Sequence, residues 1–222
     1  MLATSKPLSG TAVVPLDGLI RTCNQTENRI ATIPPRTKLF LPGIDRSETF
    51  RILQGCIALF QLLPDGRRQI VDILGPGRLF GRGISDLHQC GAEALCETQV
   101  ELVTAVRRSL DAEINQSIRQ MLRRAQAHAT LLGRKTAGER IATALIDLAG
   151  QFSNETGDGF QLHLTRMDLA DWLGLTLETV SRYLNRFRRE GLVSFEGANR
   201  IFLNDRTGLE LIAAGRELAA VQ

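Results

Sequence analysis

Two short helices separated by a glycine near residue 174 constrain the fold of this chain more than any other feature. They lie in the segment TRMDLADWLGLTLETVSRYLNRFRREGLVSF. We expect a short helix from about Arg166, a sharp turn at Gly174, and a second helix capped by Thr176 and ended by Gly191. A helix, a short Gly-containing turn and a second helix form the helix-turn-helix pattern of DNA-binding domains.

The predicted second helix has two chemically different faces. Its apolar residues recur at i, i+3, i+4 and i+7 and should pack inward; they are Val180, Tyr183, Leu184 and Phe187. The first two turns of the polar face, the part that enters a major groove, carry Glu178, Ser181 and Arg182. Arg182 can donate two hydrogen bonds to guanine, Glu178 can accept one from cytosine, and Ser181 can contact a base or a phosphate. We predict base contacts by these three residues; the alternative is a simple i, i+4 surface ion pair between Glu178 and Arg182.

Contacts to the DNA backbone are predicted for side chains beside this polar face. By position they are Arg166, Thr176, Thr179 and Arg186. The following segment, LVSFEGANRIFL, predicts a wing of two short strands that turn at Glu196–Asn199, where Asn199 and Arg200 can touch the backbone. The alternative is a hairpin that only covers the helices.

Helix starts and a short strand mark the rest of the C-terminal part. Thr136 and Glu139 form a capping-box pattern, and the helix that follows is predicted to end at Gly150. Alternation of Phe160, Leu162 and Leu164 predicts a strand, and Thr165 with Asp168 gives a second capping pattern.

Residues 30–105 have the pattern of a small antiparallel barrel or roll. Short apolar runs are separated by turn residues at intervals of roughly ten. Asp65-Gly66 predicts a hairpin, because glycine supplies the positive φ that a tight turn needs. The Gly75–Gly77 segment cannot continue a strand, because its proline lacks a backbone donor.

Residues 111–135 change to a helical period. An apolar seam with heptad spacing is formed by Ile118, Met121, Ala125, His128 and Leu132, while the other faces hold Arg119, Arg123, Arg124 and Gln126. The narrow seam with its small alanine favours pairing with a second copy; the alternative is packing on the helix's own domain.

These motifs together resemble the CRP/FNR superfamily of bacterial transcription regulators, in particular its FNR/FixK branch. The resemblance rests on LTRMDLADWLGLTLETVSRYLNRFRREGLV, on GRKTAGERIATALIDLA before it, and on the roll segment RILQGCIALFQLLPDGRRQIVDILGPGRLFG. It implies an α+β fold: an antiparallel β-roll of the cyclic-nucleotide-binding type (1–110), a dimerisation helix (111–136) and a winged helix-turn-helix (137–222). It also implies a homodimer on TTGA-N6-TCAA palindromes, with Glu178, Ser181 and Arg182 as the E-x-x-S-R signature, and RNA polymerase contact by the loop 151–159, which favours an activator.

The sensor motifs of the superfamily are where this chain departs from the resemblance. Members that bind cAMP carry a glutamate where this chain has Arg82, and no arginine for the cyclic phosphate occurs between Arg82 and Arg107. Of the N-terminal cysteines that hold an iron–sulfur cluster, only Cys23 is present. We therefore expect neither cAMP nor an iron–sulfur cluster. Haem is not excluded, with His88 as the one local ligand candidate.

Composition excludes several other classes of protein. The net charge of +3 identifies no partner, and the basic excess lies before about residue 136 rather than in the predicted DNA-binding part. No apolar run is long enough for a membrane span, so a cytoplasmic protein is expected. The sequence predicts no catalytic residues and no metal site. Its three histidines are scattered, and it contains neither a G-x-S-x-G motif nor a C-x-x-C pair. The alternatives left open are a haem- or redox-responsive regulator, with Cys90 and Cys96 as thiols, and a small β-barrel enzyme.

Overall fold

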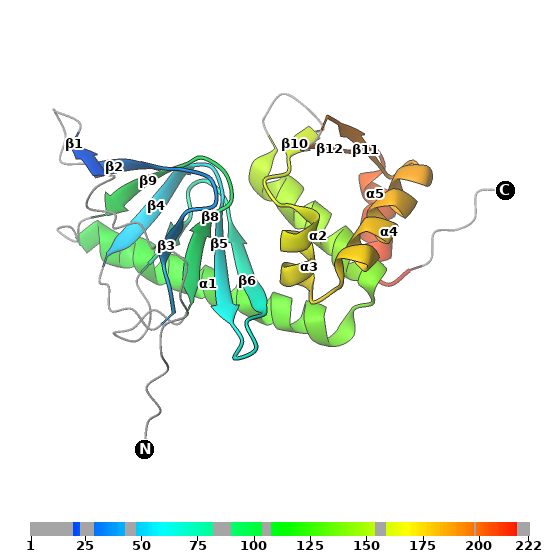
Figure 1. The fold of residues 1–222 in the computed structure, drawn as a ribbon, viewed down its shortest axis with the longest axis horizontal. Helices are drawn as coiled ribbons and strands as arrows, with labels where there is room; N and C mark the ends of the chain where they lie inside the picture. Colours follow the sequence, from blue (N-terminus) through cyan, green and yellow to red (C-terminus); the bar gives the residue numbers. More distant parts are fainter. Residues whose placement is uncertain are drawn as a thin grey trace, which may run out of the picture.

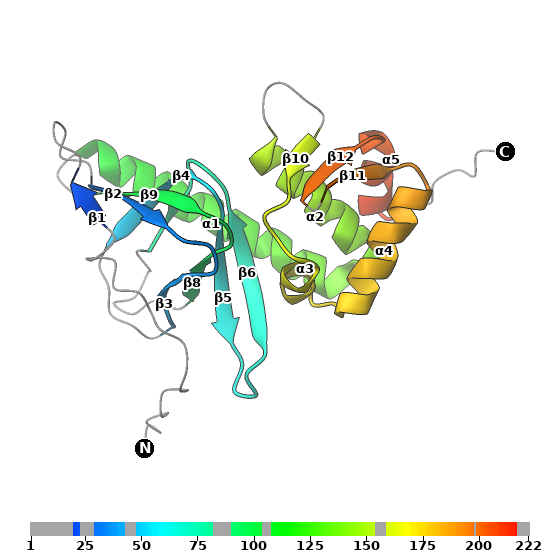
Figure 2. The same ribbon diagram turned by 45° about the horizontal axis from the view of Figure 1, so that its top comes forward.

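The computed structural model describes residues 20–22, 29–42, 48–81, 90–103, 108–153, 159–197 and 199–216. A β-roll forms the N-terminal part, and a group of short helices with a small sheet forms the C-terminal part. A long helix runs from the roll to the C-terminal helices and links the two (Figures 1 and 2). The predicted α+β architecture is confirmed.

Two antiparallel sheets make up the roll. The five-stranded sheet has the order β1 (Ile20–Thr22), β2 (Arg29–Ile33), β9 (Thr98–Val103), β4 (Thr49–Gln54), β7 (Leu79–Phe80). The four-stranded sheet has the order β3 (Lys38–Phe40), β8 (Gly91–Ala94), β5 (Ile57–Leu62), β6 (Arg68–Leu74). Apolar side chains fill the space between the sheets, and Ile33, Phe40, Phe50, Ile52 and Phe80 are all buried there.

The predicted hairpin joins β5 to β6. Gly66 has φ of 87°, and the Leu63 amide donates to the Arg67 carbonyl at 2.8 Å to close the turn. The Gly75–Gly77 segment also ends β6 as expected, with the chain turning before β7.

The long helix α1 (Arg108–Arg134) packs against β6 of the roll and also contacts the next two helices of the chain through Arg124 and His128. Arg124, which the sequence places off the apolar seam, is half-buried. Its Nε donates to Asp72 of β6 at 2.8 Å, and its Nη1 donates to Asp147 of the next helix at 2.9 Å. A helical period alone does not tell which polar side chain finds a buried carboxylate, so the sequence could not place Arg124.

The C-terminal part consists of α2 (Ala137–Phe152), β10 (Gly159–Gln161), α3 (Arg166–Leu173), α4 (Leu177–Arg189), β11 (Val193–Glu196), β12 (Arg200–Leu203) and α5 (Arg206–Ala213). The predicted start of α2 is confirmed, because the Thr136 amide donates to the Glu139 carboxylate at 3.3 Å. The predicted end at Gly150 was wrong: α2 continues to Phe152. A solvent-exposed glycine costs a helix only about 1 kcal/mol, which neighbouring buried residues such as Leu148 offset.

One apolar cluster unites the roll with the C-terminal part. Phe60, Ile70 and Ile73 of β5 and β6 belong to the same buried cluster as Leu148 of α2 and Trp172 of α3. The roll therefore packs directly on the helices that carry the candidate site.

Candidate nucleic-acid interface

The turn between α3 and α4 is built as the sequence predicts. Thr165 Oγ1 accepts from the Asp168 amide at 3.1 Å, which caps α3. Gly174 ends α3 in the left-handed region, with φ of 61°. Thr176 Oγ1 accepts from the Thr179 amide at 3.2 Å and starts α4. These three local features fix the angle between the two helices.

The inner face of α4 holds the helix in the domain core. Val180, Leu184 and Phe187 are fully or nearly fully buried, and Tyr183 is half-buried with its ring at an edge contact to Phe187. Burial of three large side chains in a helix of 13 residues leaves little freedom of rotation about the helix axis. The opposite face of α4 is therefore presented in one orientation.

The three residues predicted to contact bases all lie on the outward side of α4. Glu178 and Arg182 are exposed, and Ser181 is half-buried. Among the ion pairs of the described residues, none joins Glu178 to Arg182. The surface-pair alternative therefore has no support in the geometry.

The residues predicted to contact phosphates have different local partners. Arg166 of α3 donates to Ser181 Oγ at 3.2 Å, which brings the two helices' polar groups together. The hydroxyls of Thr176 and Thr179 lie 3.0 Å apart at the start of α4. Arg186 is paired with Glu190 at 2.7 Å, an exposed contact worth at most about 1 kcal/mol that another anion can replace.

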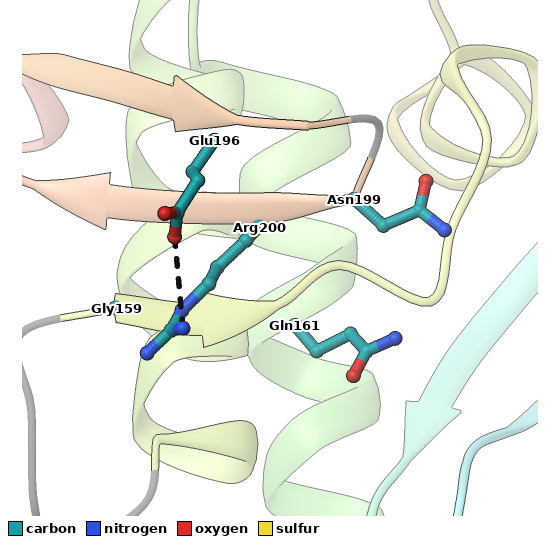
Figure 3. A pocket seen from close by; sticks show the side chains of 5 residues that line it. All are labelled: Gly159, Gln161, Glu196, Asn199 and Arg200. Carbon is teal, nitrogen blue, oxygen red and sulfur yellow. Dashed lines mark ion pairs between the residues drawn. The ribbon is translucent and has the colours of Figure 1, made fainter.

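The wing is present as an antiparallel pair of β11 and β12, with β10 as a third strand. Figure 3 shows Arg200 turned toward Glu196, its partner at 3.6 Å, while Asn199 points the other way. Asn199 and Arg166 line the same cavity beside α3. The structure thus places Asn199 near the helix-turn-helix, whereas Arg200 lies along the wing over the ring of Phe202.

A buried ionic network that the sequence did not reveal joins α3 to the roll. Asp168 is 1% exposed and accepts hydrogen bonds from Arg36 at 2.7 Å and Arg68 at 2.6 Å. Arg68 also contacts Glu93 of β8 at 2.7 Å and Asp171 of α3 at 2.9 Å. Burial alone raises the pKa of Asp168, but the hydrogen bonds from Arg36, Thr165 and Arg68 outweigh it and hold the pKa well below its usual range.

A single arginine clamps the turn to the end of α1. Arg140 donates to the carbonyls of Leu132 at 2.7 Å and Lys135 at 2.9 Å, at the C-terminal end of α1. It also donates to the carbonyl of Leu173 at 2.9 Å, just before Gly174. The orientation of the helix-turn-helix is thereby tied to that of α1.

The outer side of α1 carries an apolar stripe. Ile118, Met121 and Leu122 are 41, 38 and 59% exposed, and Ala125 is exposed as well. His128, which the sequence placed in this seam, instead stacks on Trp172 of its own chain, with ring centroids 6.2 Å apart. Leu132 is half-buried and packs near Gly174.

The thiols and possible metal ligands form no reactive cluster in the described part of the chain. Burial raises the pKa of the Cys90 and Cys96 thiols, which lowers the fraction of reactive thiolate. Within the described residues, no three His, Cys, Asp or Glu side chains are grouped to hold a metal ion. Cys23, Arg82 and His88 lie outside those residues.

Two protein-family models match the chain, one over the roll and the other over the C-terminal part. Residues 31–117 match the cyclic nucleotide-binding domain, and residues 139–212 match the Crp-like helix-turn-helix domain. The nitrogen fixation regulation protein FixK of Rhizobium meliloti is 34% identical over 177 residues, which are 78% of this chain and 81% of FixK. The chain belongs to the CRP/FNR family of transcription regulators.

Further relatives place this CRP/FNR regulator in the FNR/FixK branch. The structure of FixK2 from Bradyrhizobium japonicum superposes with a TM-score of 0.74 at 33% identity, covering 88% of this chain and all of that one. The transcriptional activator protein FnrA of Stutzerimonas stutzeri is 33% identical over 80% of this chain and 77% of FnrA. These relatives are transcription regulators and not enzymes, so the alternative of a small β-barrel enzyme is wrong.

The α3–α4 unit is thus the DNA-binding element of a CRP/FNR regulator. The match to the cyclic nucleotide-binding domain establishes the family of the roll and identifies no specific ligand. None of the described helices is long and apolar enough to cross a membrane.

Proposed function

We propose that this CRP/FNR regulator binds as a homodimer to palindromic promoter DNA of the TTGA-N6-TCAA type and activates transcription there. The observation that carries the proposal is the outward face of α4. Glu178 and Arg182 are exposed and unpaired with each other, while Val180, Leu184 and Phe187 anchor the opposite face. Glu178, Ser181 and Arg182 are the base-contacting residues in this proposal.

Backbone contacts supply most of the affinity in the proposed complex. Arg166 and Arg186 are exposed cations on either side of the base-contacting residues, and Thr176, Thr179 and Asn199 add neutral donors. Arg200 has to leave Glu196 to reach a phosphate. Because these contacts release counterions, binding depends steeply on salt concentration.

Pairing of α1 helices sets the distance between the two recognition helices. Each helix-turn-helix is tied to its own α1 by Arg140, so the way the two α1 helices pair determines whether the recognition helices lie one DNA turn, roughly 34 Å, apart. We propose that α1 (with 111–136 as the dimerisation segment) pairs through Ile118, Leu122 and Ala125, with Met121 at the edge. The roll (1–110) and the DNA-binding part (137–222) then lie on either side of it.

Activation is favoured by the names of the relatives and by one loop. FnrA is named a transcriptional activator. In this chain the segment 151–159, between α2 and β10, is proposed to contact RNA polymerase; most of it lies outside the described residues.

The proposed function is tested by selecting bound sequences from a random DNA pool, with and without exposure of the protein to oxygen. We expect two TTGA half-sites in inverted orientation, enriched equally in both conditions. Enrichment of an unrelated motif, or none, contradicts the proposed specificity. Enrichment only without oxygen supports the redox-responsive alternative.

Leu122→Glu is expected to convert the dimer to a monomer. The substitution puts two like charges into the centre of the proposed seam, where each loses its water. Sedimentation at micromolar concentration measures the change. Gln116→Glu, which adds the same charge at an exposed position on another side of α1, is the control and should stay dimeric. A dimeric Leu122→Glu variant would place the interface elsewhere.

Addition of cAMP at micromolar concentration is expected to leave the melting temperature unchanged. A ligand at 100 times its Kd stabilises a protein by about 2.7 kcal/mol, which a thermal scan detects easily. The chain has Arg82 where members that bind cAMP carry a glutamate, and no arginine follows before Arg107 to pair with the cyclic phosphate. A saturable rise in melting temperature with cAMP contradicts this prediction.

A further inference from the structure

A cavity of about 440 Å³ lies where the roll, α1, α2 and α3 meet, and the DNA-binding proposal makes no use of it. Its wall includes Asp72 of β6, Asp147 of α2 and Trp172 of α3. Cavities that bind small molecules in proteins have volumes of about 300–1,000 Å³ and combine an apolar wall with a few polar groups. This cavity has the size of such a site.

Three arginines line the cavity, but only one of them is neutralised. Arg124 donates hydrogen bonds to both Asp72 and Asp147. Arg78 and Arg123 have no side-chain hydrogen bond or ion pair with any described residue. Two cations therefore face the cavity with the neighbouring carboxylates already occupied.

Arg78 is the more unusual of the two, because it is half-buried. Burial and the nearby charge of Arg124 lower its pKa, and the charges of Asp72 and Asp147 offset this only in part. Asp72 and Asp147 lie close enough to attract Arg78, but both carboxylates are hydrogen-bonded to Arg124. The guanidinium donors of Arg78 therefore fit an anion that enters the cavity from solution.

The aromatic side of the cavity is formed by His128 and Trp172. Their rings are stacked with an interplanar angle of 10°, and both line the cavity. The Nε2 atom of His128 is buried without a hydrogen-bond partner. Buried polar atoms are rarely left unsatisfied, and those that are often mark a site for a missing group.

The cavity stays open in the proposed dimer. Each residue of a helix is turned by about 100° from the last, so Ile118, Leu122 and Ala125 lie within about 40° of one direction. Arg124, Ala127 and Leu131, which line the cavity, lie more than about 100° away from that direction. Pairing through the apolar stripe therefore leaves the cavity accessible.

We propose that this cavity binds a small aromatic anion, a carboxylate or phosphate carried on a planar ring. Arg78 and Arg123 bind the anionic group, because the guanidinium fork matches two oxygens of a carboxylate or phosphate. The ring lies along the His128–Trp172 pair, and His128 Nε2 contacts a polar ring atom or the anion. The proposal is independent of which DNA sequence the protein binds.

Trp172 is the only tryptophan of the chain, so its fluorescence reports on the cavity directly. The full-length protein is titrated with benzoate and phenyl phosphate as the two anionic probes, and with benzamide as the uncharged analogue, without DNA. We expect a saturable fluorescence change with at least one anion and binding of benzamide weaker by about tenfold or more. No saturable change with either anion, or equal binding of benzamide, overturns the proposal.

Substitutions distinguish a specific role of Arg78 and Arg123 from a general effect of positive charge on the protein surface. Arg78→Gln and Arg123→Gln are each expected to weaken binding of the anion by about tenfold or more. The controls are Arg67→Gln in the roll and Arg119→Gln in α1, which replace exposed arginines that do not line the cavity. Both variants should bind the anion with unchanged affinity. Equal affinity of Arg78→Gln and wild-type protein contradicts the assignment.

A measurement without ligand distinguishes a binding role of Arg78 from a structural one. Because Arg78 is half-buried and has no hydrogen-bond or ion-pair partner among the described residues, Arg78→Gln is expected to melt at the same temperature as wild-type protein or higher. A lower melting temperature, or failure to fold, shows that Arg78 supports the fold and overturns the proposal.

Discussion

Replacing Arg182 with alanine is expected to abolish the preference of the protein for a TTGA-containing palindrome. Arg182 is exposed on the second turn of α4, and its backbone position is fixed by the buried Val180 and Leu184. One bidentate arginine–guanine contact gives about 1–3 kcal/mol of discrimination, and a dimer makes two, so the specificity ratio should fall by roughly 30-fold to 10⁴-fold. Titrations of palindromic and random duplexes at one salt concentration measure this ratio.

Arg186→Ala is the matched control for this loss of specificity. Arg186 lies one turn further along α4 and is proposed to bind a phosphate, after exchanging Glu190 for it. Its removal should weaken binding to all sequences alike and reduce the salt dependence by about one counterion per half-site. Equal losses on palindromic and random DNA for Arg182→Ala would contradict a role in base recognition.

Replacing Asp168 with asparagine is expected to lower the free energy of unfolding by about 2–4 kcal/mol. Breaking a buried ion pair costs about 3–5 kcal/mol, but Arg68 keeps Glu93 and Asp171 and the Arg36 side chain is 40% exposed, which reduces the loss. Denaturant unfolding measures the change. Asp171→Asn, on the same helix, removes only one contact to Arg68 and should cost clearly less. Equal small losses for both variants would show that the network contributes little.

The same carboxylate gives a pH dependence with a defined sign. The pKa of Asp168 is lower in the folded protein than in the unfolded chain, where it is about 3.9. At pH values between the two pKa values, the unfolded chain therefore binds more protons than the folded protein. Its stabilising contribution is therefore complete above about pH 4 and is lost as the pH falls below it. The wild-type protein should lose stability more steeply than Asp168→Asn in this range.

The local features of the DNA-binding element could be predicted from sequence because they depend on neighbouring residues. Gly174, Thr176 and the Thr165–Asp168 cap act within a few positions along the chain, and each is present in the structure. The second role of Asp168 could not be predicted in this way. Its partners Arg36 and Arg68 are 132 and 100 residues away, and no spacing rule connects them.

The seam of α1 shows a different limit of sequence reasoning. Apolar residues spaced by three and four occupy more than one side of this helix, and the period does not tell which side packs on the helix's own chain. His128 stacks on Trp172, whereas Leu122, absent from the predicted seam, is the most exposed large apolar residue in the described part of the chain. Only the packing of the roll and α2 against α1 distinguishes the two sides.

The contacts of Arg140 have a consequence for how this regulator can change its target sites in evolution. In the proposed dimer, the hydrogen bonds of Arg140 hold α1 and the helix-turn-helix together, so that they rotate as one rigid unit. Insertion of one residue into α1 between the seam and the clamp rotates each recognition helix by about 100° around the axis of α1. Half-site spacing therefore cannot drift gradually through changes in helix length, whereas base preference can change through single substitutions on α4. We therefore expect base preference to vary more readily among related regulators than half-site spacing.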